Sequence, residues 1–355
     1  MSSLCFMLPE ALAQGISKKD IHYSIPPDES RTMDLYIPNN AAVPSAAASP
    51  PPVILWIHGG GWIMGDKSTA PATELLGHGY AVASINYRFA TQARFPAQLD
   101  DCLAAVSWLK AHAGEFHVNA NDMAVIGESS GGHLAALLGT MPGNSVKAVI
   151  TLGAPTDLST IAAQAQFPGQ KFLAADGGQV AMLLGTPARK NPELALSASP
   201  VKYASRNSAP FLILAGTLDQ IVPIQQSVEL NDRLKSQGAV SELIMVPGAG
   251  HAIQGPDWQK PGFPFLDKYL NYTPLSQQPP STPSQSPPWS GAQTQPANPA
   301  NPFAGRESPH DRRARRRALR DQQNASSSGM SSDPAEPGVM PANSAGSNEA
   351  PISPF

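Results

Sequence analysis

The feature that most constrains this chain is a short stretch around Ser129. An apolar run ends at Gly127, and Gly131 and Gly132 follow the serine and lead into a second apolar run. The pattern predicts a strand, a tight turn with Ser129 at its apex, and a helix. Residues two before and two after such an apex must be small, because the strand and helix backbones come together there.

The same stretch also has a chemical interpretation. A serine at the carboxyl end of a strand and the amino end of a helix is exposed where the helix dipole favours developing negative charge. The Gly-x-Ser-x-Gly spacing is that of a nucleophile elbow. The alternative is a glycine-rich turn with solvated serines. A base, an acid and an oxyanion hole at the same edge of a sheet would favour the first interpretation.

Composition limits the classes of protein to consider. With 355 residues and 41% hydrophobic residues, the chain can form one large α/β domain or two small ones. The formal charge of −3 does not indicate nucleic-acid binding, and no apolar stretch is long enough for a membrane span. Cys5 and Cys102 lie far apart and indicate neither a disulfide nor a metal framework, so we expect Cys102 to be a buried free thiol. Oligomeric state stays open.

The first residues resemble the end of a secretory signal. Apolar residues 4–8 precede Ala11-Leu12-Ala13-Gln14, an A-x-A pattern with a cleavage junction between Ala13 and Gln14. No basic residue comes before them and the apolar part is short. Our hypothesis is a truncated signal peptide over residues 1–17 and a secreted or periplasmic protein. The alternative is a disordered start of a cytoplasmic protein.

The composition changes abruptly after about Thr273, where Pro, Ser, Gln, Asn and Ala dominate. Such a segment buries too little apolar surface to offset its ordering entropy, so residues 273–355 are predicted to be a disordered tail. Its arginine cluster at residues 312–320 could bind anions or nucleic acid, but we favour a solvated charge run. Residues 18–272 remain as the folded domain.

Within that domain, strands alternate with helices, which predicts a mostly parallel central sheet with helices on both faces. An antiparallel hairpin over residues 21–25 and 32–37 begins it. Residues 156–199 have an irregular pattern with small helical pieces and are interpreted as a modest cap or lid. The strands are expected at residues 53–58, 81–86, 123–126, 146–152, 211–216 and 242–246, and the helices at residues 68–77, 96–112, 134–138, 224–235 and 258–269.

His251 is the candidate base. It lies on a glycine-rich loop directly after the last predicted strand, at the carboxyl edge of the sheet. A serine hydroxyl is a poor nucleophile until an imidazole takes its proton. His133 is expected to pack at the start of the helix after Ser129, and His58 to hold the triple-glycine loop by hydrogen bonding. The other histidines fall in an edge strand, helix ends, loops or the tail.

Asp219 is the candidate acid, since a carboxylate must orient the imidazole and stabilise its cation. It follows the predicted strand at residues 211–216, at the same edge. The alternatives are a helix-capping role for Asp219, or Asp232 or Asp257 as the acid. The resulting chain order, Ser129, Asp219, His251, is that of α/β-hydrolases.

The oxyanion hole is expected in His58-Gly59-Gly60-Gly61, a loop whose backbone can approach a substrate closely. The amides of Gly60, Gly61 and Ser130 are the predicted donors. A phosphate-binding loop is the alternative for three glycines, but the Walker lysine and the Rossmann spacing are missing.

With these parts together, residues 18–271 resemble the α/β-hydrolase superfamily, in particular the bacterial acetyl esterase/feruloyl esterase-like branch. The stretches that carry this likeness, besides the two glycine motifs, are Asn86-Tyr87-Arg88, residues 94–102 and 105–109, Ser199-Pro200-Val201, residues 210–213 and residues 246–251.

The resemblance implies an α/β-hydrolase fold and hydrolysis of short acyl esters, often acetyl or hydroxycinnamoyl groups on plant polysaccharides, with no metal or other cofactor. Small-molecule or carbohydrate-linked esters are the implied partners. Related hormone-sensitive-lipase-like esterases and arylformamidases share these motifs, so an amidase-type hydrolase stays an alternative, as does a non-catalytic ligand-binding hydrolase fold.

Two positions depart from the pattern. Thr217 stands where the family often has the first aspartate of Gly-Asp-x-Asp, which puts in doubt how the acid loop is held. Ser130 stands where an alanine is common, and we expect little effect because only its amide is needed.

Overall fold

A computed structural model describes residues 16–38, 49–143 and 146–273 of the chain. The predicted tail, apart from Thr273, and the signal-like residues 4–14 lie outside this described part.

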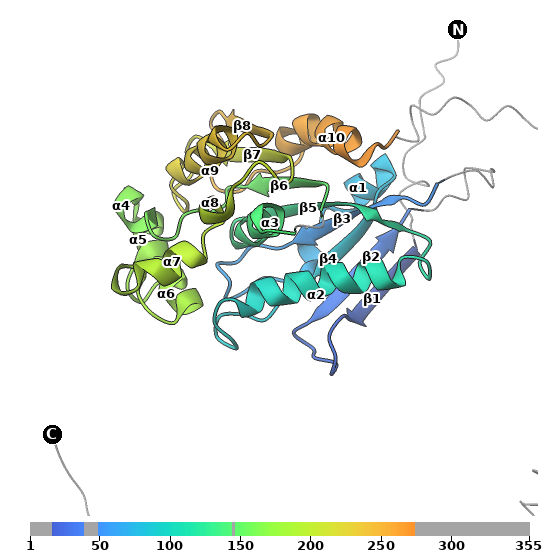
Figure 1. The fold of residues 1–355 in the computed structure, drawn as a ribbon, viewed down its shortest axis with the longest axis horizontal. Helices are drawn as coiled ribbons and strands as arrows, with labels where there is room; N and C mark the ends of the chain where they lie inside the picture. Colours follow the sequence, from blue (N-terminus) through green and yellow to red (C-terminus); the bar gives the residue numbers. More distant parts are fainter. Residues whose placement is uncertain (1–15, 39–48, 144–145, 274–355) are drawn as a thin grey trace, which may run out of the picture. The chain divides into compact units, whose positions relative to one another are not determined.

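The described residues form an eight-stranded sheet in the order β1-β2-β4-β3-β5-β6-β7-β8 (Figure 1). β1 and β2 pair antiparallel, as do β2 and β4, whereas every pair from β4 to β8 is parallel. The predicted fold class is therefore confirmed. The strands are β1 (Ile16–His22), β2 (Thr32–Ile37), β3 (Pro52–Ile57), β4 (Ala81–Ile85), β5 (Asn119–Glu128), β6 (Ala148–Leu152), β7 (Phe211–Gly216) and β8 (Ser241–Val246).

Helices cover both faces of the sheet. Every residue of β3, β4, β6 and β7 is buried, as expected for strands packed on both sides. One apolar cluster contains residues of α1 and α10, and the other contains residues of α2, α3 and α9. The helices are α1 (Ala72–His78), α2 (Ala97–His112), α3 (Ser130–Thr140), α4 (Ile161–Gln164), α5 (Pro168–Ala174), α6 (Gln179–Leu184), α7 (Pro192–Ser197), α8 (Pro200–Tyr203), α9 (Gln225–Ser236) and α10 (Pro256–Leu270).

Parallel pairing brings the carboxyl ends of the central strands to one edge. Ile57 of β3 pairs with Gly127 of β5, and Leu152 of β6 pairs with Leu214 of β7. The loops that follow these strands therefore meet at that edge, and they are the loops that carry the predicted site residues.

Several sequence expectations were wrong in their bounds, and the first strand and the helix expected from residue 68 show why. The first strand ends at His22 and begins at Ile16, instead of covering residues 21–25. Its residues 17–20 are polar and exposed at the sheet edge, so they lack the alternation that marks a half-buried strand. The helix expected from residue 68 starts at Ala72, because Pro71 separates it from a short 3-10 turn, Lys67–Thr69.

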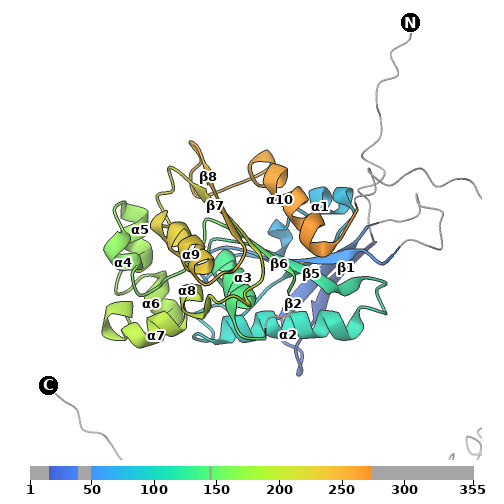
Figure 2. The same cartoon turned by 45° about the horizontal axis from the view of Figure 1, so that its top comes forward.

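The irregular residues 156–199 form an insert between β6 and β7. It contains the short helices α4 to α7 and a 3-10 turn, Ala188–Lys190, as the broken pattern predicted. Figures 1 and 2 both show α4 to α7 grouped at one end of the described fold. Across the described residues, every helix is too short or too polar to cross a lipid bilayer.

Candidate active site

Ser129 occupies the turn between β5 and α3 that the sequence predicts. Its φ is 51° and its ψ is −120°, a region that side-chain-bearing residues rarely adopt. The glycines permit this turn. A Cβ atom on Gly127 would lie 2.3 Å from the Gly131 carbonyl oxygen, and one on Gly131 would lie 2.1 Å from the Ile57 carbonyl oxygen. Gly132 is similarly close to Ala154, so all three positions exclude a side chain.

His251 and Asp219 come together from loops 32 residues apart. His251 Nδ1 lies 2.8 Å from Asp219 Oδ2. The second carboxylate oxygen, Oδ1, accepts the amides of Ile221 and Val222 at 2.8 and 2.9 Å. Oδ2 of this buried carboxylate therefore makes the expected pairing, whereas Oδ1 closes a turn of its own loop. The alternative of a helix-capping role was wrong, because α9 begins at Gln225 with Ile224 before it and no side-chain cap. Because Nδ1 donates to Asp219, Nε2 of His251 is left as the proton acceptor.

The two loops are also joined by their backbones. The Thr217 hydroxyl oxygen accepts the Gly248 amide at 2.8 Å, and the Leu218 amide donates to the Ala249 carbonyl at 2.9 Å. Thr217 therefore holds the loop that leads to His251. This is the structural consequence of the departure at residue 217.

Gly153 lies behind the His251–Asp219 pair. Its φ is +59°, and a Cβ atom there would come within 3.3 Å of both Asp219 Oδ2 and His251 Nδ1. The glycine follows β6 directly, and its amide donates to the Leu214 carbonyl at 2.9 Å. The imidazole–carboxylate pair thus packs directly against bare backbone.

The triple-glycine loop lies beside Ser129. Gly60 and Gly61 have φ values of +112° and +62°, which glycine adopts without strain. In the described part of the chain, the amides of Gly60 and Gly61 have no hydrogen-bond acceptor. Ser130 is the first residue of α3, so its amide has no acceptor within the helix. These are the three amides that were predicted from the sequence to be oxyanion donors.

His58 supports this loop from below. Its Nδ1 lies 2.7 Å from the Gly59 carbonyl oxygen, and its ring stacks on Tyr87 at 4.6 Å. The Tyr87 hydroxyl donates to the His58 carbonyl at 3.0 Å and lies 3.5 Å from Ser130 Oγ. Burial lowers the pKa of His58, so the ring is neutral. The predicted loop-holding contact is present.

His133 packs inside the fold, as expected. It is fully buried, accepts the Trp62 indole N–H on Nδ1 at 3.3 Å, and donates from Nε2 to the Ala198 carbonyl at 2.6 Å. Burial lowers the pKa of His133 to about 4. Both ring nitrogens are used by these contacts, so His133 has no nitrogen left to receive a proton from Ser129.

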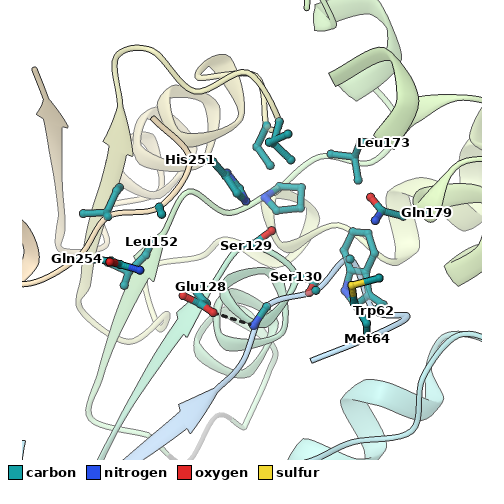
Figure 3. Close-up of a pocket in the computed structure, with 18 residues that line it drawn as sticks. Trp62, Met64, Glu128, Ser129, Ser130, Leu152, Leu173, Gln179, His251 and Gln254 are labelled. Carbon is teal, nitrogen blue, oxygen red and sulfur yellow. Dashed lines mark hydrogen bonds between the residues drawn. The ribbon is translucent and has the colours of Figure 1, made fainter. Parts of the chain in front are cut away.

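A cavity of about 370 Å³ opens over Ser129 (Figure 3). Ser129, His251 and the triple glycine all line it, whereas Asp219 lies behind His251. Its lining residues are Gly59, Gly60, Gly61, Trp62, Met64, Glu128, Ser129, Ser130, Leu152, Pro155, Leu173, Gln179, Ile221, Val222, His251, Ala252, Ile253 and Gln254.

Among the lining residues that were not identified from the sequence, three stand out. Glu128 accepts the Gly59 amide at 3.4 Å and so ties the triple-glycine loop to the turn at Ser129. Its place between Gly127 and Ser129 could have indicated this. Trp62 is buried with φ +61° directly after the triple glycine. Gln179 comes from α6 of the insert, where no periodic pattern marks it.

The insert is held to the rest of the fold by side-chain hydrogen bonds. Gln226 of α9 accepts the amides of Thr156 and Asp157, both at 2.7 Å. Gln170 of α5 donates to the Asp219 carbonyl at 2.9 Å and accepts the amide of residue 167 at 3.2 Å. Both glutamine side chains are buried. The insert is therefore fixed at its start and against the acid loop.

Among the residues that the structure describes, no group of three or more His, Cys, Asp or Glu side chains lies together as metal ligands would. Cys102 is buried and free, as expected.

Known proteins resemble this chain along most of its described part. It is 30% identical over 226 residues to Esterase LipC of Mycobacterium tuberculosis, covering 60% of this chain and 56% of LipC. It is also 30% identical over 214 residues to ethyl acetate hydrolase of Pseudomonas putida, covering 56% of this chain and 64% of that protein. The chain thus spans somewhat more than half the length of these curated relatives.

A solved structure shares the fold more completely. The truncated form of a carbohydrate esterase from gut microbiota superposes with a TM-score of 0.66 at 25% identity, covering 74% of this chain and 99% of that one. The BD-FAE family model matches residues 33–234, which is more than half of the 355 residues. The chain belongs to the BD-FAE family, in the esterase branch of the α/β-hydrolases.

Proposed function

We propose that residues 18–272 are the catalytic domain of a serine carboxylic ester hydrolase that cleaves short-chain acyl esters, of acetyl or feruloyl type, through an acyl-Ser129 intermediate. The observation that carries the proposal is the 2.8 Å contact between His251 and Asp219 at the cavity that also exposes Ser129. The esterase activities printed for the relatives agree with it.

In the first step, Ser129 Oγ attacks the ester carbonyl carbon while its proton moves to His251 Nε2. The new carbon–oxygen bond places a negative charge on the carbonyl oxygen. The amides of Gly60, Gly61 and Ser130 are the donors for this charge, and losing one such donor costs about 2.7–4 kcal/mol of barrier. Asp219 stabilises the imidazolium that forms.

Collapse of the tetrahedral intermediate breaks the bond to the alkoxy group, which leaves as an alcohol with the proton from His251. A water molecule then attacks the acyl-Ser129 ester, again giving its proton to His251. The carboxylic acid leaves and Ser129 regains its hydrogen. One ester and one water become one acid and one alcohol.

The cavity lining favours a neutral substrate. None of the lining residues is a lysine or arginine, and Glu128 carries a carboxyl group close to Ser129. An acid or phosphate group on the substrate would have no cation to pair with here, and a neutral acyl ester or a sugar-linked ester meets no such penalty. A volume of about 370 Å³ suits a short acyl group.

The test is Ser129→Ala. We expect the variant to keep the wild-type circular dichroism spectrum and to lose at least about 10⁴-fold in kcat/KM for p-nitrophenyl acetate. Wild type, and not the variant, should be labelled by a fluorophosphonate probe. Wild-type turnover in Ser129→Ala would refute the role of this serine. Aryl formamide assayed beside the ester discriminates the amidase alternative, and an unlabelled, inactive wild type would support a ligand-binding fold.

A further inference from the structure

One side of the cavity, called the insert side, is formed by the insert together with Trp62 and Met64, and it has a polar end that the mechanism does not use. Figure 3 shows Gln179, Leu173, Trp62 and Met64 on one side of Ser129, and Glu128 and Gln254 on the other. The residues on the insert side are apolar except for Gln179.

The chemistry of the tetrahedral intermediate indicates which part of the substrate lies on each of these two sides. The oxyanion faces the glycine amides, and the leaving alkoxy group must lie next to His251, which gives it a proton. Gln254 belongs to the loop that carries His251. The acyl chain takes the remaining direction, toward the insert.

The Gln179 carboxamide lies directly against the oxyanion loop. The Cβ position of Gly61 is 2.4 Å from Gln179 Nε2 and 2.5 Å from its Cδ, so the amide fills the space that a side chain on Gly61 would take. Within residues 16–38, 49–143 and 146–273 the structure shows no hydrogen bond to this carboxamide. Gln179 thus ends the cavity without being held by a polar partner.

The helix that carries Gln179 is anchored. The Arg94 guanidinium donates to the Met182 carbonyl at 2.7 Å, and the Phe95 amide donates to the Leu183 carbonyl at 2.9 Å. Leu183 and Leu184 are buried in the larger apolar cluster. Because α6 is fixed to the core in this way, the backbone of Gln179 cannot retreat far when a longer acyl chain enters.

We propose that Gln179 is a specificity-determining residue: its side chain is the end wall of the acyl side and limits the length of acyl chain that the enzyme accepts. This inference rests on the proposed ester hydrolysis and adds to it the residue that sets the acyl preference.

The experiment compares kcat/KM for p-nitrophenyl acetate, butyrate and hexanoate in wild type and in Gln179→Ala, Gln179→Asn and Gln179→Met. Shortening the side chain at position 179 should raise the hexanoate-to-acetate ratio of kcat/KM. We expect a rise of at least about tenfold in the alanine variant and a smaller rise in the asparagine variant. A methionine side chain has a length similar to that of glutamine but lacks the amide. The Gln179→Met variant should therefore keep the wild-type hexanoate-to-acetate ratio within about threefold.

Gln254→Ala is the matched control, because it removes a glutamine side chain from the opposite side of the same cavity. Its hexanoate-to-acetate ratio should equal that of wild type, whatever its absolute rate. If Gln179→Ala does not fold, the asparagine variant decides, since it retains the amide and shortens the side chain by one methylene.

Two results would overturn the inference while leaving the proposed function intact: active alanine and asparagine variants with the wild-type ratio, or a methionine variant whose ratio rises as much as that of alanine. A wild type that neither turns over acetate nor reacts with a fluorophosphonate probe would remove the proposed function, and the inference with it.

Discussion

The two sides of the cavity are built by different means. On the sheet side, Ser129 is positioned by backbone, through strand register and through glycines that exclude any side chain. On the insert side, the wall is attached by individual side chains, namely Gln226 at its start, Gln170 against the acid loop and His133 at its end.

This difference in construction suggests that the two sides of the cavity contribute separately to the reaction and to substrate selectivity. Backbone positioning tolerates little change, because a displaced oxyanion donor or nucleophile costs several kcal/mol of barrier. Side-chain attachment can be altered one residue at a time, each at about 1–3 kcal/mol. Under the proposed function, the sheet side is therefore suited to keeping the chemistry constant, and the insert side to varying the acyl group accepted.

The variant Gly131→Ala is expected to have the largest effect, and it tests whether the sheet side is more constrained than the insert side. Its Cβ would lie 2.1 Å from a backbone oxygen, so the start of α3 must move away from the oxyanion loop. We expect a loss of about 3 kcal/mol in the free energy of unfolding and at least about 100-fold in kcat. Urea unfolding and ester kinetics measure the two effects.

Gly177→Ala is the control for that substitution. Gly177 lies in the insert, and a Cβ there meets nothing within 4 Å. The same chemical change should alter stability by no more than about 0.5 kcal/mol. Equal losses in both variants would show that the sheet side is not the more constrained one.

His133, which joins α3 to the Ala198 carbonyl, should make the fold sensitive to acid. Its pKa is about 4 in the folded protein because of burial, against about 6.5 when unfolded. The unfolded chain therefore binds a proton between these values that the folded chain does not. Stability is complete above pH 6.5 and falls by about 3 kcal/mol as the pH drops to 4.

His133→Gln isolates this contribution, since glutamine offers one donor and one acceptor and does not titrate. Urea unfolding from pH 7.5 to 4.5 should show a smaller loss in the variant than in wild type. His58, whose pKa burial also lowers, keeps part of the slope in both proteins. Identical slopes would contradict the role of His133.

The smallest expected effect tests the contact between α5 and the acid loop. Gln170→Glu keeps an acceptor for the residue 167 amide but removes the donor to the Asp219 carbonyl. We expect kcat to fall about tenfold, with KM nearly unchanged, because the acid turn is held less firmly. A wild-type kcat would mean that the insert does not support Asp219, and Gln170→Ala should lower stability further.

The parts that the sequence predicts well are those with a short-range physical signature. Gly127, Gly131 and the triple glycine are visible because close backbone approach admits only glycine. The contact between His251 and Asp219 follows from parallel strands that bring their carboxyl ends to one edge. The catalytic roles themselves stay predictions until the variants are measured.

The parts that sequence reasoning missed depend on long-range contacts of residue types with no pattern. Gln170 and Gln179 lie in irregular helices, and nothing local distinguishes them from a solvated glutamine. The first strand was predicted several residues too late in the sequence, because β1 is an edge strand whose polar residues lack the expected alternation. The support that Thr217 gives to Gly248 was visible only as a departure from a family pattern.

Gly153 carries a consequence for how such a site can change over time. It supplies no reacting group, yet any side chain there would press on both members of the imidazole–carboxylate pair. A study of variants that considered only the reacting residues would treat Gly153 as a position that tolerates substitution. Under the proposed function, the reaction therefore also depends on a position that has no side chain, because a Cβ at φ +59° is strained and lies 3.3 Å from both atoms of the pair.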